Sequence, residues 1–293
     1  MSTSAIATGR STAADYLELT KPRITVLVML TALVGFVMGS QGRLSPTALV
    51  AALLGTGLVA AGASALNMVL ERHTDTLMWR TRNRPLPGGR LRPSEAATFG
   101  SLLTLTGLLE LIWLSDPVAA AVAALTWVTY VFAYTPLKTR TSLSTIVGAF
   151  PGALPPVIGW AAARGSVDHG AFVLFAILFL WQIPHFLAIA WIYREDYARG
   201  GLPMLPVLDT EGRMTGRQAV ANSLALLLVS LTPTAAGMTG RLYFGGALAL
   251  GLAFVATALR AAVLRSMPAA RALFLASLVY LTGICVLLVV DKV

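Results

Sequence analysis

Long apolar runs dominate the chain and are separated by short polar or Gly- and Pro-containing connections. Each run holds roughly 20 residues, the length that an α-helix needs to cross about 30 Å of hydrocarbon. No soluble domain fits between them. The pattern predicts one all-α domain over 1–293, a bundle of about nine transmembrane helices at 22–40, 47–70, 95–114, 117–135, 142–162, 170–192, 218–237, 243–263 and 270–290.

Composition supports a membrane protein. Hydrophobic residues make up 56% of the 293 residues and charged residues only 12%, which is too apolar for a soluble domain of this size. The first sixteen residues lack the apolar core of a signal peptide, so we predict a short cytoplasmic arm over 1–16. The single Cys285 excludes a disulfide and a cysteine-based metal site.

The net charge of +9 could suggest a nucleic-acid partner, but the basic residues are distributed differently. With the N-terminus in the cytoplasm, most of the 22 basic residues fall on the cytoplasmic face, and the exceptions are Arg43, Arg164, Arg241 and Lys292. This bias obeys the positive-inside rule. We therefore predict a multi-pass protein of the cell inner membrane, with a cytoplasmic N-terminus, the lipid bilayer as a partner and no nucleic acid.

The segment over 67–92, which reads NMVLERHTDTLMWRTRNRPLPGGRLR, concentrates polar residues after the second apolar run. Asn67, Glu71 and Asp75 are spaced by four, so on a helix they share one face and form a strip of oxygen atoms. The segment also holds six arginines, more than two acids can neutralise, and such a surplus suits a polyanion. The alternative is that the acids merely form ion pairs with these arginines.

A second acidic segment, WIYREDYARGGLPMLP, places Glu195 and Asp196 at the cytoplasmic end of the sixth predicted helix. Four helices separate the two acidic segments, so both face the cytoplasm, where a central cavity could open between them. Lys138 and Arg140 lie on the same side. Carboxylates with surplus cations suit a Mg²⁺-diphosphate, because Mg²⁺ prefers oxygen ligands and positive charge stabilises a diphosphate leaving group.

The chain has no GxxxxGK[ST] loop and no GxGxxG after a strand, so nucleotide hydrolysis and dinucleotide redox chemistry have no support. A transporter or a lipid-binding protein remains an alternative, because acids within a membrane can serve ion pathways. Few charges lie at mid-membrane depth, however, and Glu110 is the main exception.

Six blocks of sequence resemble the UbiA superfamily of intramembrane prenyltransferases, whose members are nine-helix bundles with two Asp-rich motifs on the cytoplasmic side. They are LTKPRIT (19–25), NMVLERHTDTLMWRTRNRPLP (67–87), YTPLKTRT (134–141), GALPPVIGWA (152–161), WQIPHF (181–186) and YREDYARGGLPMLP (193–206). Within the superfamily, RTRNRP, the Pro-Pro-x-x-Gly-Trp block and WQIPHF resemble the branch that farnesylates heme.

The resemblance implies a set of catalytic Mg²⁺ ligands and a set of diphosphate contacts. The ligands are Asn67, Glu71 and Asp75 on one side with Asp196 on the other, and the diphosphate contacts are Arg80, Arg84 and Lys138. Two residues depart from the general pattern, since Glu71 replaces an Asp and Gly200 replaces the second Asp of an Asp-x3-Asp motif. Glu195 could supplement Asp196. We assign Lys21 and Arg23 only to the charge bias.

His185 in WQIPHF is a candidate heme-binding residue. Pro184 removes a backbone hydrogen bond and can open the helix locally. The imidazole would lie about 11 Å from the cytoplasmic end, at 1.5 Å per residue, and could bind heme iron or a propionate. The alternative is a histidine hydrogen-bonded to a neighbouring helix.

The reaction implied by the resemblance is transfer of farnesyl from farnesyl diphosphate to a vinyl group of heme b. Addition of water would give heme o, and diphosphate would be released. A heme a synthase would then be a partner acting downstream, on the route to the heme of terminal oxidases. An aromatic prenyltransferase of the 4-hydroxybenzoate type and a non-enzymatic transporter or lipid-binding protein remain the alternatives.

Overall fold

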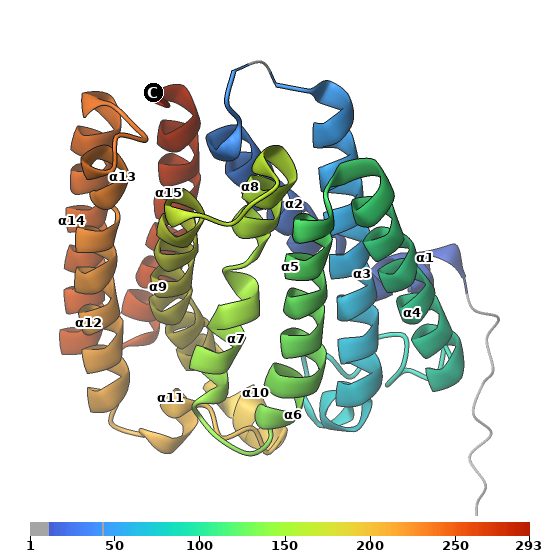
Figure 1. Cartoon of the computed structure of the whole chain (residues 1–293). Helices are drawn as coiled ribbons and strands as arrows, with labels where there is room; N and C mark the ends of the chain where they lie inside the picture. Colours follow the sequence, from blue (N-terminus) through green and yellow to red (C-terminus); the bar gives the residue numbers. More distant parts are fainter. Residues whose placement is uncertain (1–11, 43) are drawn as a thin grey trace, which may run out of the picture.

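The computed structural model describes residues 12–42 and 44–293, and it is helical throughout these ranges apart from loops and one isolated bridge between Thr239 and Lys292 (Figure 1). Nine helical segments of this described part are long and apolar enough to cross a membrane. The all-α, nine-helix prediction is confirmed. Residues 1–11 of the predicted arm lie outside the described residues, and a short helix, α1 (Ala13–Leu19), follows them.

Each predicted transmembrane segment coincides with one observed span. The spans are α2 (Pro22–Gly39), α3 (Pro46–Leu77), α4 (Pro93–Glu110) with η1 (Leu111–Ser115), α5 (Pro117–Val128) with η2 (Thr129–Tyr134) and α6 (Thr135–Leu137), α7 (Ser144–Gly152) with α8 (Pro155–Arg164), α9 (His169–Ile192), α12 (Arg213–Val229) with α13 (Thr232–Ala235), α14 (Arg241–Leu264) and α15 (Met267–Val290). Two short helices, α10 (Arg194–Arg199) and α11 (Leu205–Leu208), connect α9 to α12.

The polar connections gather at one end of the bundle. The helices α6, α10 and α11 lie at the lower end in Figure 1, and the C-terminus lies at the upper end. At the upper end Lys292 donates hydrogen bonds to the carbonyl oxygens of Val37 and Ser40, each at 2.6 Å, and so ties the C-terminus to α2. The predicted central cavity open to the cytoplasm remains a prediction.

Glycine allows the helices to approach closely, because a small residue at a crossing lets two backbones come together. In α3, a Cβ atom at Gly62 would lie 2.3 Å from the Thr104 hydroxyl oxygen of α4. A tighter approach is found between α2 and α8, where a Cβ atom at Gly159 would lie 1.8 Å from the Ala32 carbonyl oxygen. The first crossing packs α3, the helix that carries the acidic strip, against α4, and α3 also contacts α2 and α8.

Pro184 does not open α9, contrary to the expectation from sequence. The helix runs without a break from His169 to Ile192, and Pro184 is buried within it. Proline within a transmembrane helix is tolerated where neighbouring helices support the backbone, and α9 packs against α7, α12 and α15. His185 is therefore presented by a regular helix.

We predict that Gly159→Ala destabilises the protein by about 3 kcal/mol or more, because the added methyl group overlaps a backbone oxygen that cannot rotate away. Gly245→Ala on α14 is the matched control, since a Cβ atom there would meet nothing within 4 Å. Unfolding of both variants in detergent would be compared with the parent chain. Equal stability of the two variants would contradict the close α2–α8 crossing.

Candidate functional site

The acidic strip of α3 is buried at the end of the bundle that carries the polar loops. Because α3 continues as a helix to Leu77, Asn67, Glu71 and Asp75 share one face as predicted. Asn67 is 1% exposed and Asp75 is fully buried. Such burial of carboxylates is costly unless each finds a partner.

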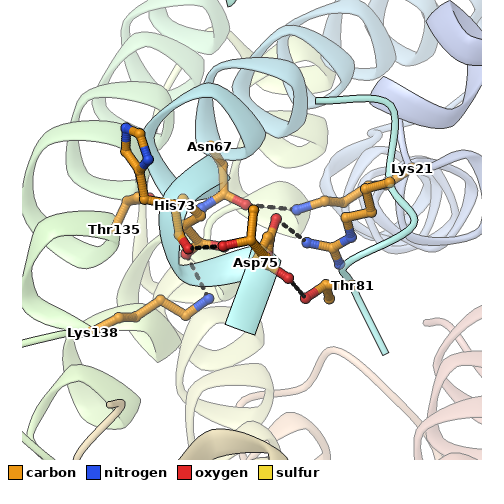
Figure 2. A network of polar contacts seen from close by, with 10 residues as sticks. Lys21, Asn67, His73, Asp75, Thr81, Thr135 and Lys138 are labelled. Atoms are coloured by element: carbon orange, nitrogen blue, oxygen red, sulfur yellow. Dashed lines mark hydrogen bonds and ion pairs between the residues drawn. The ribbon is translucent and has the colours of Figure 1, made fainter. Parts of the chain in front are cut away.

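Two of the predicted diphosphate contacts supply these partners. Lys138 Nζ lies 2.7 Å from Glu71 Oε1, and Arg84 Nη1 lies 2.8 Å from Asp75 Oδ2. Lys138 and Arg84 reach the strip from different parts of the chain, since one follows α6 and the other lies in the loop after α3. The structure thus assembles predicted anion-binding and metal-binding residues into one polar network (Figure 2).

Burial alone would lower the pKa of Lys138, but the neighbouring Tyr134 and Glu71 side chains outweigh it and raise the pKa well above its usual value. Lys138 therefore remains protonated at neutral pH. It is a permanent positive charge beside the acidic strip.

Lys21 is a member of the network that the sequence interpretation missed. Its Nζ donates to Asn67 Oδ1 at 2.6 Å, with the Lys21 backbone in the left-handed region at a φ of 47° (Figure 2). Burial, together with the positive charges of Arg84 and Lys138, lowers the pKa of Lys21 to about 7, although Glu71 opposes this shift. The sequence signal for this residue is its place in the LTKPRIT block.

A chain of hydrogen bonds fixes the orientation of the Asn67 amide. The Thr135 hydroxyl donates its one proton to the Tyr130 carbonyl oxygen at 2.8 Å, so its oxygen is left to accept from Asn67 Nδ2 at 3.1 Å. The Tyr130 carbonyl belongs to η2, a π-helical segment, and π-helical turns are frequent at functional sites. Asn67 Oδ1 must consequently face Lys21 and the strip.

The strip has the chemistry of a Mg²⁺ site. Asp75 Oδ1 is buried and has no hydrogen-bond partner among the described residues, although Asp75 Oδ2 is paired with Arg84. Two carboxylates and an amide offer the oxygen ligands that Mg²⁺ prefers. The described residues contain no cluster of three His, Cys, Asp or Glu side chains, so Asn67 would be needed to complete the set.

Asp196 lies beside the first loop but faces its backbone. Its carboxylate accepts from the N–H groups of Trp79 and Arg80, at 2.8 and 3.1 Å, and from Arg199 at 2.8 Å. Burial raises the pKa of Asp196, but these hydrogen bonds outweigh it and leave the pKa below its usual range. The two acidic segments therefore meet at one end of the bundle, and a metal-binding role for Asp196 stays a prediction.

The guanidinium group of Arg80 stacks on tyrosines of the second segment. It lies 5.1 Å from the ring centre of Tyr193 and 5.8 Å from that of Tyr197. No carboxylate pairs with the Arg80 side chain among the described residues, so its charge is available to an anion.

His185 lies deeper in the bundle, away from the strip. Its Nδ1 atom is 2.7 Å from the Ser277 hydroxyl of α15, and its ring stacks on Trp181. The contact with a neighbouring helix matches the alternative interpretation of this histidine. Heme binding by His185 stays a prediction.

Comparison with known proteins gives one family and several near relatives. The chain matches the UbiA prenyltransferase family over residues 28–282. It is 47% identical to a protoheme IX farnesyltransferase of Solibacter usitatus, over 95% of this chain and 98% of the relative. A protein of the same name from Koribacter versatilis is 42% identical, over 95% of this chain and 93% of the relative.

Solved structures of low sequence identity share the fold. A digeranylgeranylglyceryl phosphate synthase superposes with a TM-score of 0.80 at 15% identity, over 95% of this chain and 97% of that chain. A UbiA homologue from Archaeoglobus fulgidus, bound to GPP and Mg²⁺, superposes with a TM-score of 0.65 at 16% identity, over 94% and 99% of the two chains.

We predict that Thr135→Val weakens Mg²⁺-dependent binding of inorganic diphosphate about 10-fold, because the freed Asn67 amide loses its fixed orientation. Thr135→Ser, which keeps the hydroxyl, should bind like the parent chain. Calorimetric titration with diphosphate, with and without Mg²⁺, measures the effect. Normal Mg²⁺-dependent binding by the valine variant would remove Thr135 from the site.

Proposed function

The chain belongs to the UbiA prenyltransferase family, and from this premise we propose that it transfers the farnesyl group of farnesyl diphosphate to a vinyl group of heme b. Water adds in the same reaction, and the products are heme o and diphosphate. Near-complete alignment with relatives named protoheme IX farnesyltransferase, at 47% and 42% identity, is the observation that carries the choice of acceptor.

The network around α3 supports binding of the diphosphate end of the donor. Three basic side chains, Lys21, Arg84 and Lys138, converge on the strip within hydrogen-bond distance. Arg84 and Lys138 can exchange their carboxylate partners, and Lys21 its amide partner, for phosphate oxygens, because guanidinium and ammonium groups bind such oxygens. Arg80, whose guanidinium group lies over the rings of Tyr193 and Tyr197, adds a further positive charge nearby.

We assign the Mg²⁺ ligands to Asn67, Glu71 and Asp75, with Asp196 on the second side. The unpartnered Asp75 Oδ1 is the atom that supports this assignment. Bound Mg²⁺ would supply positive charge that lowers the energy of the departing diphosphate. Lys138 and Arg84 would add to the same stabilisation, because negative charge grows on the leaving group as the allylic carbon–oxygen bond breaks.

The chemistry of the acceptor accounts for the uptake of water. The allylic farnesyl cation adds to the terminal carbon of a heme vinyl group, and positive charge moves to the carbon beside the pyrrole, where the macrocycle delocalises it. No ring proton can leave to restore aromaticity, as one does in 4-hydroxybenzoate. The carbon therefore captures water, one proton is released, and a hydroxyethylfarnesyl group results.

His185 is the residue that we assign to heme. It lies about 11 Å from the cytoplasmic end of its helix, at 1.5 Å per residue. This position is deeper in the membrane than the charged network and within the apolar part of the bundle. A diphosphate at the polar end and a heme at this depth would place the farnesyl chain between them. The 4-hydroxybenzoate alternative would leave the WQIPHF block without a function.

The charge bias supports a cytoplasmic N-terminus in the cell inner membrane, with the network on the cytoplasmic side. Farnesyl diphosphate, which carries a charged head, would then enter from the cytoplasm with its tail in the bilayer. The product would pass to an enzyme that oxidises heme o, a heme a synthase.

We predict that Glu71→Gln or Asp75→Asn lowers Mg²⁺-dependent turnover about 100-fold or more, because each change removes a ligand charge at constant volume. The unfolding midpoint in detergent should barely move, which separates lost chemistry from lost folding. Near-normal turnover of either variant at limiting Mg²⁺ would favour a purely ion-pairing role for the strip.

The reaction itself is tested by incubating the purified chain with heme b, farnesyl diphosphate and Mg²⁺ in ¹⁸O-labelled water. The heme product should gain one farnesyl group and one labelled hydroxyl group by mass. A farnesylated heme without solvent oxygen would contradict the cation mechanism. Prenylated 4-hydroxybenzoate with unchanged heme would contradict the choice of acceptor.

A further inference from the structure

The imidazole of His185 is restrained on three sides at the contact between α9 and α15. The Trp181 ring lies 4.8 Å from it at an interplanar angle of 24°, and the Phe274 ring lies 5.2 Å away at 32°. The Ser277 hydroxyl oxygen is 2.7 Å from Nδ1, and the histidine is 9% exposed. The ring therefore has little freedom to rotate.

The hydrogen bonds of Ser277 determine which ring nitrogen carries the proton. A serine hydroxyl has a single proton to donate, and Ser277 Oγ donates it to the Phe274 carbonyl oxygen at 2.5 Å. The Ser277 oxygen must then accept the hydrogen bond from His185, so Nδ1 is protonated. In a neutral imidazole the other nitrogen, Nε2, keeps its lone pair.

A neutral ring is expected at this place. No carboxylate pairs with His185 among the described residues, and a charged side chain within the membrane is costly. In the described part of the chain, Ser277 is also the only hydrogen-bond partner of the ring, and it engages Nδ1. The protein thus leaves Nε2 without a partner of its own.

Ser277 anchors the neighbouring aromatic ring as well. Its carbonyl oxygen accepts from Trp181 Nε1 at 2.7 Å, so one residue of α15 fixes both side chains that α9 turns toward it. The two hydrogen bonds restrain different rings, since the hydroxyl of Ser277 engages His185 and its carbonyl oxygen engages the Trp181 ring on which His185 stacks. The pair fixes the tautomer and the plane of the imidazole together.

We propose that Ser277 is a positioning residue that holds His185 as the Nδ1–H tautomer and so presents the Nε2 lone pair to the iron of heme b. The proposal rests on the proposed function, because heme is the acceptor there. Iron is bound by an unprotonated imidazole nitrogen. A hydrogen bond at the other nitrogen orients the ring and strengthens it as a ligand.

The test is a titration of the full chain in lipid nanodiscs with heme b, followed by the Soret band. Ser277→Ala should weaken heme binding about 10-fold and shift the band, as loss of an outer partner of a ligand does. Ser277→Thr, which keeps the hydroxyl, should restore both. His185→Ala should lose the band of a histidine-bound heme. The double variant that combines His185→Ala with Ser277→Ala should bind heme no more weakly than His185→Ala alone.

Ser223→Ala is the matched control. Ser223 is also buried in a transmembrane helix and donates to its own helix at the Ala219 carbonyl oxygen, 2.8 Å away. It contacts no imidazole, so its heme titration should equal that of the parent chain.

Added imidazole should return the histidine-bound spectrum to His185→Gly, which a packing role could not explain.

Three results would overturn the proposal while leaving the proposed function in place. The first is an unchanged heme spectrum in His185→Ala. The second is a normal heme affinity of Ser277→Ala when the heme affinity of His185→Ala is reduced. The third is a heme affinity of the double variant that is lower than that of His185→Ala. A parent chain that neither binds nor farnesylates heme would instead overturn the proposed function itself.

Discussion

Charge buried where the bundle meets an aqueous face is the constraint on which this structure depends. Asp75 is fully buried and the Glu71 side chain is 14% exposed, and an unpaired carboxylate in such a place is costly. Each carboxylate is therefore met by a cation at 2.7–2.8 Å. The start of α2, the end of α6 and the loop after α3 must converge on one point to supply the positive charge.

Several backbone and side-chain contacts hold these three segments in place around the strip. The left-handed backbone of Lys21 turns the chain between α1 and α2, and Thr135 fixes the Asn67 amide through η2. Asp196 holds the backbone of Trp79 and Arg80, so the arginine-rich loop is secured by the second acidic segment. Part of the polarity of these segments thus supports the loops beside the strip.

The depth at which groups lie separates two kinds of chemistry along the membrane normal. Cations and carboxylates occupy the polar end, where a diphosphate can be bound and released. His185 and its aromatic neighbours lie within the apolar part, among Trp181, Phe186 and Phe274. An allylic cation needs such a shielded environment, because exclusion of water prevents its premature capture.

The sequence by itself determined the nine membrane helices and the shared face of Asn67, Glu71 and Asp75. Both follow from local rules, since apolar length sets a span and helical periodicity sets a face. Only the tertiary structure decided that Lys21 joins the strip, that Asp196 faces backbone N–H groups, and that His185 meets Ser277. These contacts join residues 46 to 117 positions apart, and helix packing, which no local pattern encodes, brings them together.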